Sequence, residues 1–72
     1  MNDPLFELKL KTYKEQRTPL HLTLENKNWV NCYVVKILKD HFIAQEYFNK
    51  NLMPIYFKDI FDMRIYKKLE VK

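Results

Sequence analysis

No arrangement of residues in this sequence matches a catalytic motif. There is no glycine and no serine, which excludes glycine-rich phosphate loops and serine nucleophiles. Cys32 is the only cysteine, and it lies in an apolar stretch where a thiol should be inert. With His21 and His41 it gives no ligand spacing for a structural zinc ion. We therefore expect no enzyme, no metal or other cofactor, and no small-molecule substrate.

The chain is richer in aromatic rings and cations. Aromatic residues make up 15% of it, and 13 Lys and Arg against 9 Asp and Glu give a formal net charge of +4. Cations neutralise phosphates and aromatic rings stack on bases, so this composition suits a nucleic-acid partner. The alternative is a basic protein with a solvated surface, because the excess of positive charge is modest.

The elements that must position these side chains begin with a helix over about residues 4–17. Pro4 suits the first helical position, and Phe6 and Leu10, four residues apart, start an apolar face. The helix should end before Pro19, because the residue preceding a proline avoids the α region.

From Leu20 onward the apolar period changes from helical to two, which predicts strands. Pro54 falls inside one of them and indicates an edge strand or a bulge. We expect a mainly β single domain, residues 1–72, in which the helix caps a five-stranded, strongly bent antiparallel sheet or small SH3-like barrel. The expected segments are strands at about 20–25, 29–38, 42–48, 52–58 and 62–66, and a charged tail at 67–72.

The size of the chain predicts an oligomer. A domain of 72 residues buries only about 60% of the surface of its unfolded chain, yet 47% of this chain is apolar. Apolar side chains of the last two strands would then be exposed in a monomer, and pairing of free edges would cover them. The residues expected there are Met53, Ile55, Phe57, Met63 and Ile65.

No membrane partner is expected. The N-terminus lacks the basic start of a signal peptide, and no apolar run approaches the about 20 residues needed to cross a bilayer. The sequence is therefore typical of a cytoplasmic protein with one reduced thiol.

Four segments, in order along the chain, resemble segments of the Hfq family of Sm-like RNA-binding proteins. The last of them is similar to the family's second Sm signature. The segments are Asn2-Asp3-Pro4-Leu5-Phe6, Lys14-Glu15-Gln16-Arg17-Thr18-Pro19-Leu20, Asp40-His41-Phe42-Ile43 and Ile55-Tyr56-Phe57-Lys58-Asp59-Ile60. The resemblance implies an Sm-like fold and a closed homo-oligomeric ring, with a hexamer favoured. It also implies binding of uridine-rich single-stranded RNA and a role as an RNA chaperone in post-transcriptional regulation.

The same resemblance implies a uridine-binding pore face. Phe42 would stack on uracil, His41 would hydrogen-bond a base edge, and Lys58 would meet phosphate where the family has a histidine. Asn2 would touch uridine from the helix start, and Tyr56 belongs to the same face. The alternatives are a core phenylalanine, a solvated turn histidine, a surface lysine and a tyrosine packed between subunits.

Two further surfaces follow from the resemblance. On the opposite face the family reads adenines with a first-strand tyrosine, but this chain has Thr23 there, and Trp29 is the other stacking candidate or a partly buried structural residue. A basic rim for RNA annealing, or merely a solvated helix face, would comprise Lys9, Lys11, Lys14 and Arg17.

Two other function classes stay open on the sequence alone. One is a small SH3-like barrel that binds protein within a larger assembly, and the other is a DNA-binding regulatory barrel. The oligomeric state separates them from the RNA-binding ring, because only the ring requires a closed assembly.

Overall fold

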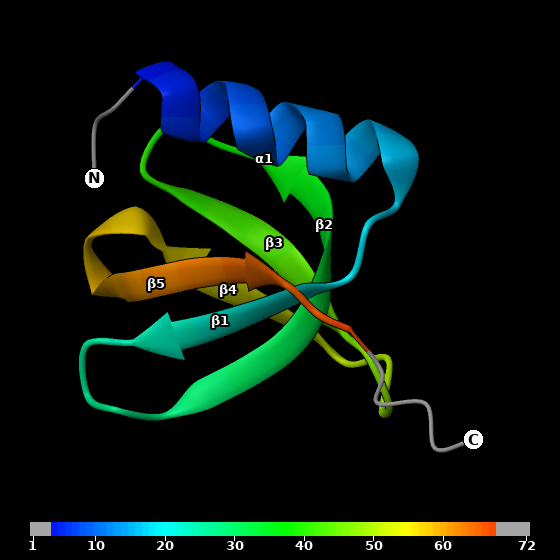
Figure 1. Cartoon of the computed structure of the whole chain (residues 1–72), viewed down its shortest axis with the longest axis vertical. Helices are drawn as coiled ribbons and strands as arrows, with labels where there is room; N and C mark the ends of the chain where they lie inside the picture. The colour runs from blue at the N-terminus through cyan, green and yellow to red at the C-terminus, as the bar shows by residue number, and fades with distance from the viewer. Residues whose placement is uncertain (1–3, 68–72) are drawn as a thin grey trace.

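Five antiparallel strands, one α-helix and one 3-10 helix make up residues 4–67, the part of the chain that the computed structural model describes (Figure 1). The predicted helix and all five strands are confirmed, with small shifts at their ends. The residues of the tail from 68 to 72 and the candidate Asn2 lie outside the described residues. The elements are α1 (Pro4–Gln16), β1 (Leu20–Leu24), β2 (Trp29–Ile37), β3 (His41–Glu46), β4 (Leu52–Tyr56), the 3-10 helix η1 (Phe57–Asp59) and β5 (Ile60–Ile65).

The strands form one open sheet in the order β4-β3-β2-β1-β5. Each neighbouring pair is antiparallel, and β4 and β5 are the two edges, so the sheet is not a closed barrel within the described residues. Pro54 lies in β4, which confirms the expectation of an edge strand. A proline is tolerated there because an edge strand leaves backbone groups without ladder partners.

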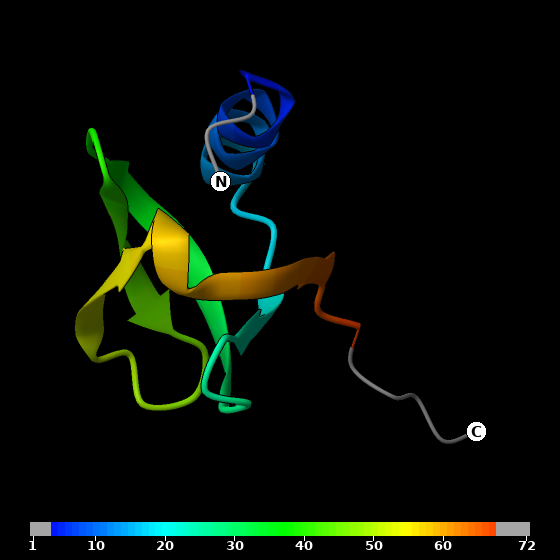
Figure 2. The ribbon, with the colours of Figure 1, turned by 90° about the vertical axis from the view of Figure 1, so that its left-hand side faces the viewer.

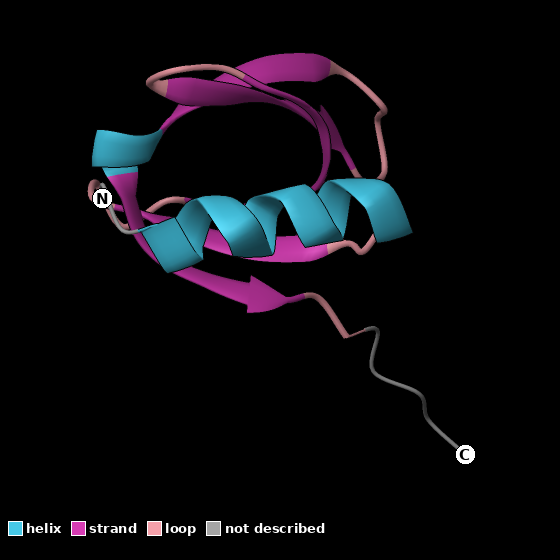
Figure 3. Ribbon diagram, turned by 90° about the horizontal axis from the view of Figure 1, so that it is seen from above, coloured by secondary structure: helices cyan, strands magenta, loops and turns pink. Residues whose placement is uncertain are grey.

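A bulge in β2 gives the sheet its bend without glycine. Val34 pairs with Ala44, but the next pair joins Lys36 to Ile43, so Val35 is the extra residue. An extra residue bends its strand and increases the local twist. Figure 3 shows the sheet curling as a result, with α1 lying across its open end in Figures 1 and 2.

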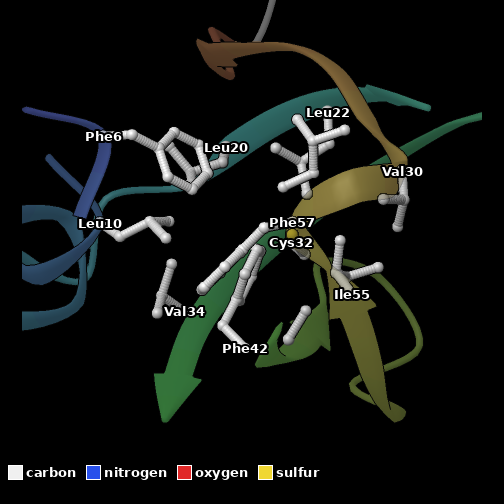
Figure 4. Packing of buried hydrophobic residues seen from close by; sticks show 12 residues of the cluster. Phe6, Leu10, Leu20, Leu22, Val30, Cys32, Val34, Phe42, Ile55 and Phe57 are labelled. Atoms are coloured by element: carbon white, nitrogen blue, oxygen red, sulfur yellow. The ribbon is translucent and has the colours of Figure 1, made fainter. Parts of the chain in front are cut away.

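The core fills the concave side of this sheet and is closed by α1. Phe6 and Leu10 project from the helix toward the strands, where Phe42 of β3 has no exposed surface (Figure 4). Burial raises the pKa of the Cys32 thiol to about 12, so the thiol stays protonated near neutral pH. The buried residues are Phe6, Leu10, Leu20, Leu22, Val30, Cys32, Val34, Phe42, Ala44, Ile55, Phe57 and Ile60.

The predicted exposure of the fourth strand is wrong. β4 ends at Tyr56, and η1 turns Phe57 into the core, where its ring meets Phe6 edge-on at 5.4 Å between centroids. Ile55 is buried too, and Met53 and Met63 pack against the core, whereas Ile65 is exposed as expected. The exposed apolar side chains of the two edge strands are Leu52, Tyr56, Phe61 and Ile65.

Tight turns are made by cationic residues at positive φ. Lys27 (φ 71°) lies in the β1–β2 turn and Lys50 (φ 60°) in the β3–β4 turn, while Arg17 (φ 53°) ends α1. A neighbouring asparagine supports the Lys27 turn, since Asn26 Oδ1 accepts from the backbone N–H of Asn28 at 3.0 Å. Left-handed backbone is unfavourable for residues with a Cβ, so the surrounding hydrogen bonds must hold it.

Candidate nucleic-acid interface

Two rings stack across the end of β3 and β4. His41 and Tyr56 are direct register partners, and their ring centroids are 4.8 Å apart at an interplanar angle of 30°. The neighbouring register pair, Phe42 and Ile55, points into the core. Because side chains alternate along a strand, His41 and Tyr56 lie on the opposite face of the sheet. The side chain of His41 is 22% exposed and Tyr56 is 40% exposed, so a ligand can reach both.

Asp40 fixes the orientation of the His41 ring. Its Oδ1 lies 2.7 Å from Nδ1 of His41. This side-chain hydrogen bond holds the pKa of the Asp40 carboxyl below its ordinary value, so the carboxylate is ionised and can only accept. Nδ1 of His41 must therefore carry the hydrogen, and in the neutral imidazole Nε2 is then a hydrogen-bond acceptor.

A backbone hydrogen bond links the two turns beside this pair. The N–H of Phe57 donates to the carbonyl oxygen of Asp40 at 3.0 Å, which ties η1 to the β2–β3 turn. Lys58 is exposed in η1, and Lys39 is exposed next to Asp40. The structure thus brings His41 and Tyr56 into contact and carries a lysine on each of the two turns beside them.

Phe42 lies in the core instead of on a surface. It is 0% exposed, and its ring centroid is 6.4 Å from that of Phe57 in a stacked arrangement. The reason is strand alternation: when His41 faces outward, the next residue must face inward. The folded chain therefore offers no exposed face of Phe42 to a base, and the stacking role implied by the resemblance stays a prediction.

The four cations of the expected basic rim are all exposed but do not form a single row. Lys9 lines a hollow between α1 and β5 with Phe61 and Asp62. Lys11 and Lys14 lie on the other side, around a hollow that also includes Lys36 of β2. Arg17 follows the last residue of α1, and its guanidinium lies over the ring of Tyr33. Lys36 was not predicted as part of this basic surface, because only the folding of β2 against α1 brings it close to Lys11 and Lys14.

The opposite-face candidates are cross-strand neighbours at the other end of the sheet. Thr23 of β1 pairs with Trp29 of β2, and the Trp29 ring is 64% exposed instead of partly buried. His21 lies beside it, with ring centroids 5.6 Å apart, and its Nδ1 is 2.7 Å from Oδ1 of Asn31. A tryptophan this exposed can act as a stacking surface.

A second aromatic cluster was not predicted from the sequence. Tyr33 of β2 and Tyr47, which follows β3, stack at 5.5 Å, and Tyr66 and Phe48 both meet the Tyr47 ring edge-on. The only sequence signal is that Tyr33 alternates with the apolar residues of its strand, which places it on the outer face. Its contact with Tyr47 and Tyr66 depends on the sheet register.

Other site chemistries find no support in the part of the chain that the structure describes. Residues 4–67 contain no group of three or more His, Cys, Asp or Glu side chains arranged to hold a metal ion. The one α-helix of this range is too short and too polar to cross a membrane. No protein-family model matches the chain, and a search of curated proteins gives no significant match.

Proposed function

We propose that this protein is a subunit of an Sm-like homo-oligomeric ring that binds uridine-rich single-stranded RNA and acts as an RNA chaperone. The observation that carries the proposal is the partly exposed His41–Tyr56 pair, oriented by Asp40. The resemblance to the Hfq family points to the same end of β3. No catalytic step is required of any residue.

The oriented histidine gives a physical reason for a uridine preference. In the neutral imidazole its Nε2 is a hydrogen-bond acceptor, and the N3 position of uracil carries a hydrogen that can be donated to it. The N3 position of cytosine is itself an acceptor, so cytosine would face Nε2 with a lone pair. Tyr56 adds a ring on which a base can stack, and Lys39 and Lys58 supply charges for phosphates.

The open sheet supports the ring. β4 and β5 are edges with unpaired backbone groups, and each carries exposed apolar side chains. Exposed apolar edges favour pairing with another chain, and a head-to-tail contact that closes makes a ring. We propose that β4 of one subunit pairs with β5 of the next. Tyr56 on β4 would then lie at a subunit boundary, which combines the interface and binding roles expected for it.

Two measurements test the proposal. Native mass spectrometry should show a closed oligomer of six or seven subunits, and fluorescence anisotropy should show tighter binding of oligo-U than of oligo-C. His41→Ala should abolish that preference while the oligomer persists. The control is Thr12→Ala, because Thr12 is an exposed polar residue of α1 that belongs to none of the candidate binding faces. A protein that binds both oligonucleotides equally before any substitution would refute the uridine site.

A protein-binding barrel is the second candidate, and one observation favours it. Leu5 and Leu8, about one turn apart on α1, are both largely exposed. Exposed apolar pairs of this kind mark contact surfaces for protein partners. A stable monomer that binds neither RNA nor DNA would support this candidate over the ring.

A further inference from the structure

Three distant segments of the chain meet in a row of aromatic rings on the outer face of the sheet. Tyr33 and Tyr47 stack at an interplanar angle of 22°, and Tyr66 approaches Tyr47 edge-on at 5.0 Å. Backbone hydrogen bonds fix this meeting point: Tyr47 N–H donates to Asn31 at 2.8 Å and Tyr66 N–H donates to Pro19 at 2.9 Å. The rings are therefore held in place before any ligand arrives.

The row has an open end. Phe48 contacts Tyr47 edge-on at 4.9 Å but is 70% exposed, the largest exposed fraction among the large apolar side chains of residues 4–67. Phe48 lies in the β3–β4 loop and is not part of the buried cluster. An exposed ring beside a fixed aromatic row is a surface on which a base can stack.

Cations surround the same row. The guanidinium carbon of Arg17 lies 5.8 Å from the centroid of the Tyr33 ring, and within residues 4–67 it has no carboxylate partner. Arg17 and Tyr33 line two adjoining hollows of about 290 and 530 Å³. Lys14 lines the first and Lys50 the second. A cation held over a ring, with its donors unpaired, is suited to bind a phosphate.

The two adjoining hollows form one groove, and its lining contains one carboxylate, which already accepts a hydrogen bond within the protein. Glu46 lines the larger hollow, and its Oε1 accepts a hydrogen bond from Nδ2 of Asn49 at 3.1 Å. Three cations, Lys14, Arg17 and Lys50, outnumber this one carboxylate, so the groove is positively charged overall. Such a groove attracts anions, and its rings add a preference for planar groups.

We infer that this groove, lined by Lys14, Arg17, Tyr33, Tyr47 and Lys50 and flanked by Phe48, is a second contact site for single-stranded RNA, without base preference. The cations bind phosphates and Phe48 stacks on whichever base is next to it, because every base has a π-face. Acidic peptides would satisfy the cations but leave Phe48 unused, so the combination favours nucleic acid. The inference rests on the proposed function for its ligand class, but the groove lies within one subunit and needs no ring.

The groove and the His41 site are connected along one strand. Gln45 lines the groove, and His41 lies four residues earlier on β3 with its side chain on the same face. Four strand residues span about 13 Å. One RNA strand can therefore follow β3 from the uridine site to the groove, where it gains affinity without further selection of bases.

Phe48→Ala and Lys50→Gln test the groove by fluorescence anisotropy with oligo-U and oligo-C. Phe48→Ala should weaken both oligonucleotides alike, by roughly fivefold to a hundredfold, and leave the salt dependence unchanged. Lys50→Gln should also weaken both, but it should flatten the slope of log affinity against log salt by about 0.7 for one lost phosphate contact. Neither variant should alter the ratio of oligo-U to oligo-C affinity.

Matched controls are available for both variants. Lys27→Gln replaces the other turn lysine at positive φ, and Leu8→Ala removes an equally exposed apolar side chain from α1. Both controls should bind like the unaltered protein, and all variants should keep its thermal midpoint. Groove variants that bind like the controls, while His41→Ala still loses the uridine preference, would overturn the groove alone. A protein that binds no RNA would overturn the groove together with the proposed function.

Discussion

Substitution of Phe42 distinguishes a core role from a base-stacking role. The ring is fully buried between α1 and the sheet, near Phe57. Truncation of such a phenylalanine to alanine costs about 3–5 kcal/mol of unfolding free energy. At about 0.05–0.15 kcal/mol per residue, a chain of this length has only about 4–11 kcal/mol in total. Phe42→Ala should therefore lose about a quarter or more of the stability and can leave the protein unfolded.

Phe42→Leu is the sharper variant, because leucine still fills most of the site but has no aromatic face. It should lower the unfolding free energy by about 1 kcal/mol and leave oligo-U affinity unchanged. Urea denaturation followed by circular dichroism measures the first quantity, and anisotropy at a denaturant-free reference condition measures the second. A Phe42→Leu protein with unaltered stability and strongly reduced oligo-U affinity would refute the core assignment and support stacking on uracil.

Two other predictions concern the sheet edge and pH. The double change Phe61→Glu and Ile65→Lys places charges on exposed β5 side chains, so native mass spectrometry should detect monomers with an unaltered circular dichroism spectrum; an intact oligomer would count against β4–β5 pairing. The second prediction follows from the pKa of Asp40, which its hydrogen bond from His41 lowers in the folded state. This contribution is present above the ordinary aspartate range and is lost as pH falls through the lowered value. Asp40→Asn should therefore flatten the acid side of a plot of thermal midpoint against pH, and an unchanged curve would contradict the assignment.

Local patterns in the sequence predicted the elements well. The apolar period and the prolines located α1 and the five strands, and Pro54 correctly indicated an edge. The end of β4 could not be found in this way. Phe57 continues the alternation begun by Met53 and Ile55, yet the chain leaves the strand at Tyr56 and enters η1. The alternation of apolar and polar residues predicts which face of the sheet a side chain lies on, but it does not predict the residue at which strand pairing ends.

The contacts within the candidate site depend on how the strands pair, and strand pairing could not be predicted from local sequence patterns. His41 and Tyr56 were each expected at a binding face, but their contact depends on the pairing of β3 with β4. Phe42 was expected to stack on a base, with the core as the alternative, and its burial follows from its position next to an outward-facing His41. The Tyr33–Tyr47 stack depends on the bulge-shifted pairing of β2 with β3, which no local pattern encodes.

The single buried thiol also gives the molecule an internal reporter. Cys32 is fully enclosed in the core and stays protonated near neutral pH, so an alkylating reagent can react with it only in molecules that have opened. With rapid reclosing, the rate of labelling measures the population of the open form. A ligand or partner subunit that binds only the folded protein slows the labelling in proportion to its occupancy. The proposed RNA binding and assembly can thus be tested through the protection of one sulfur atom, without a dye or an introduced residue.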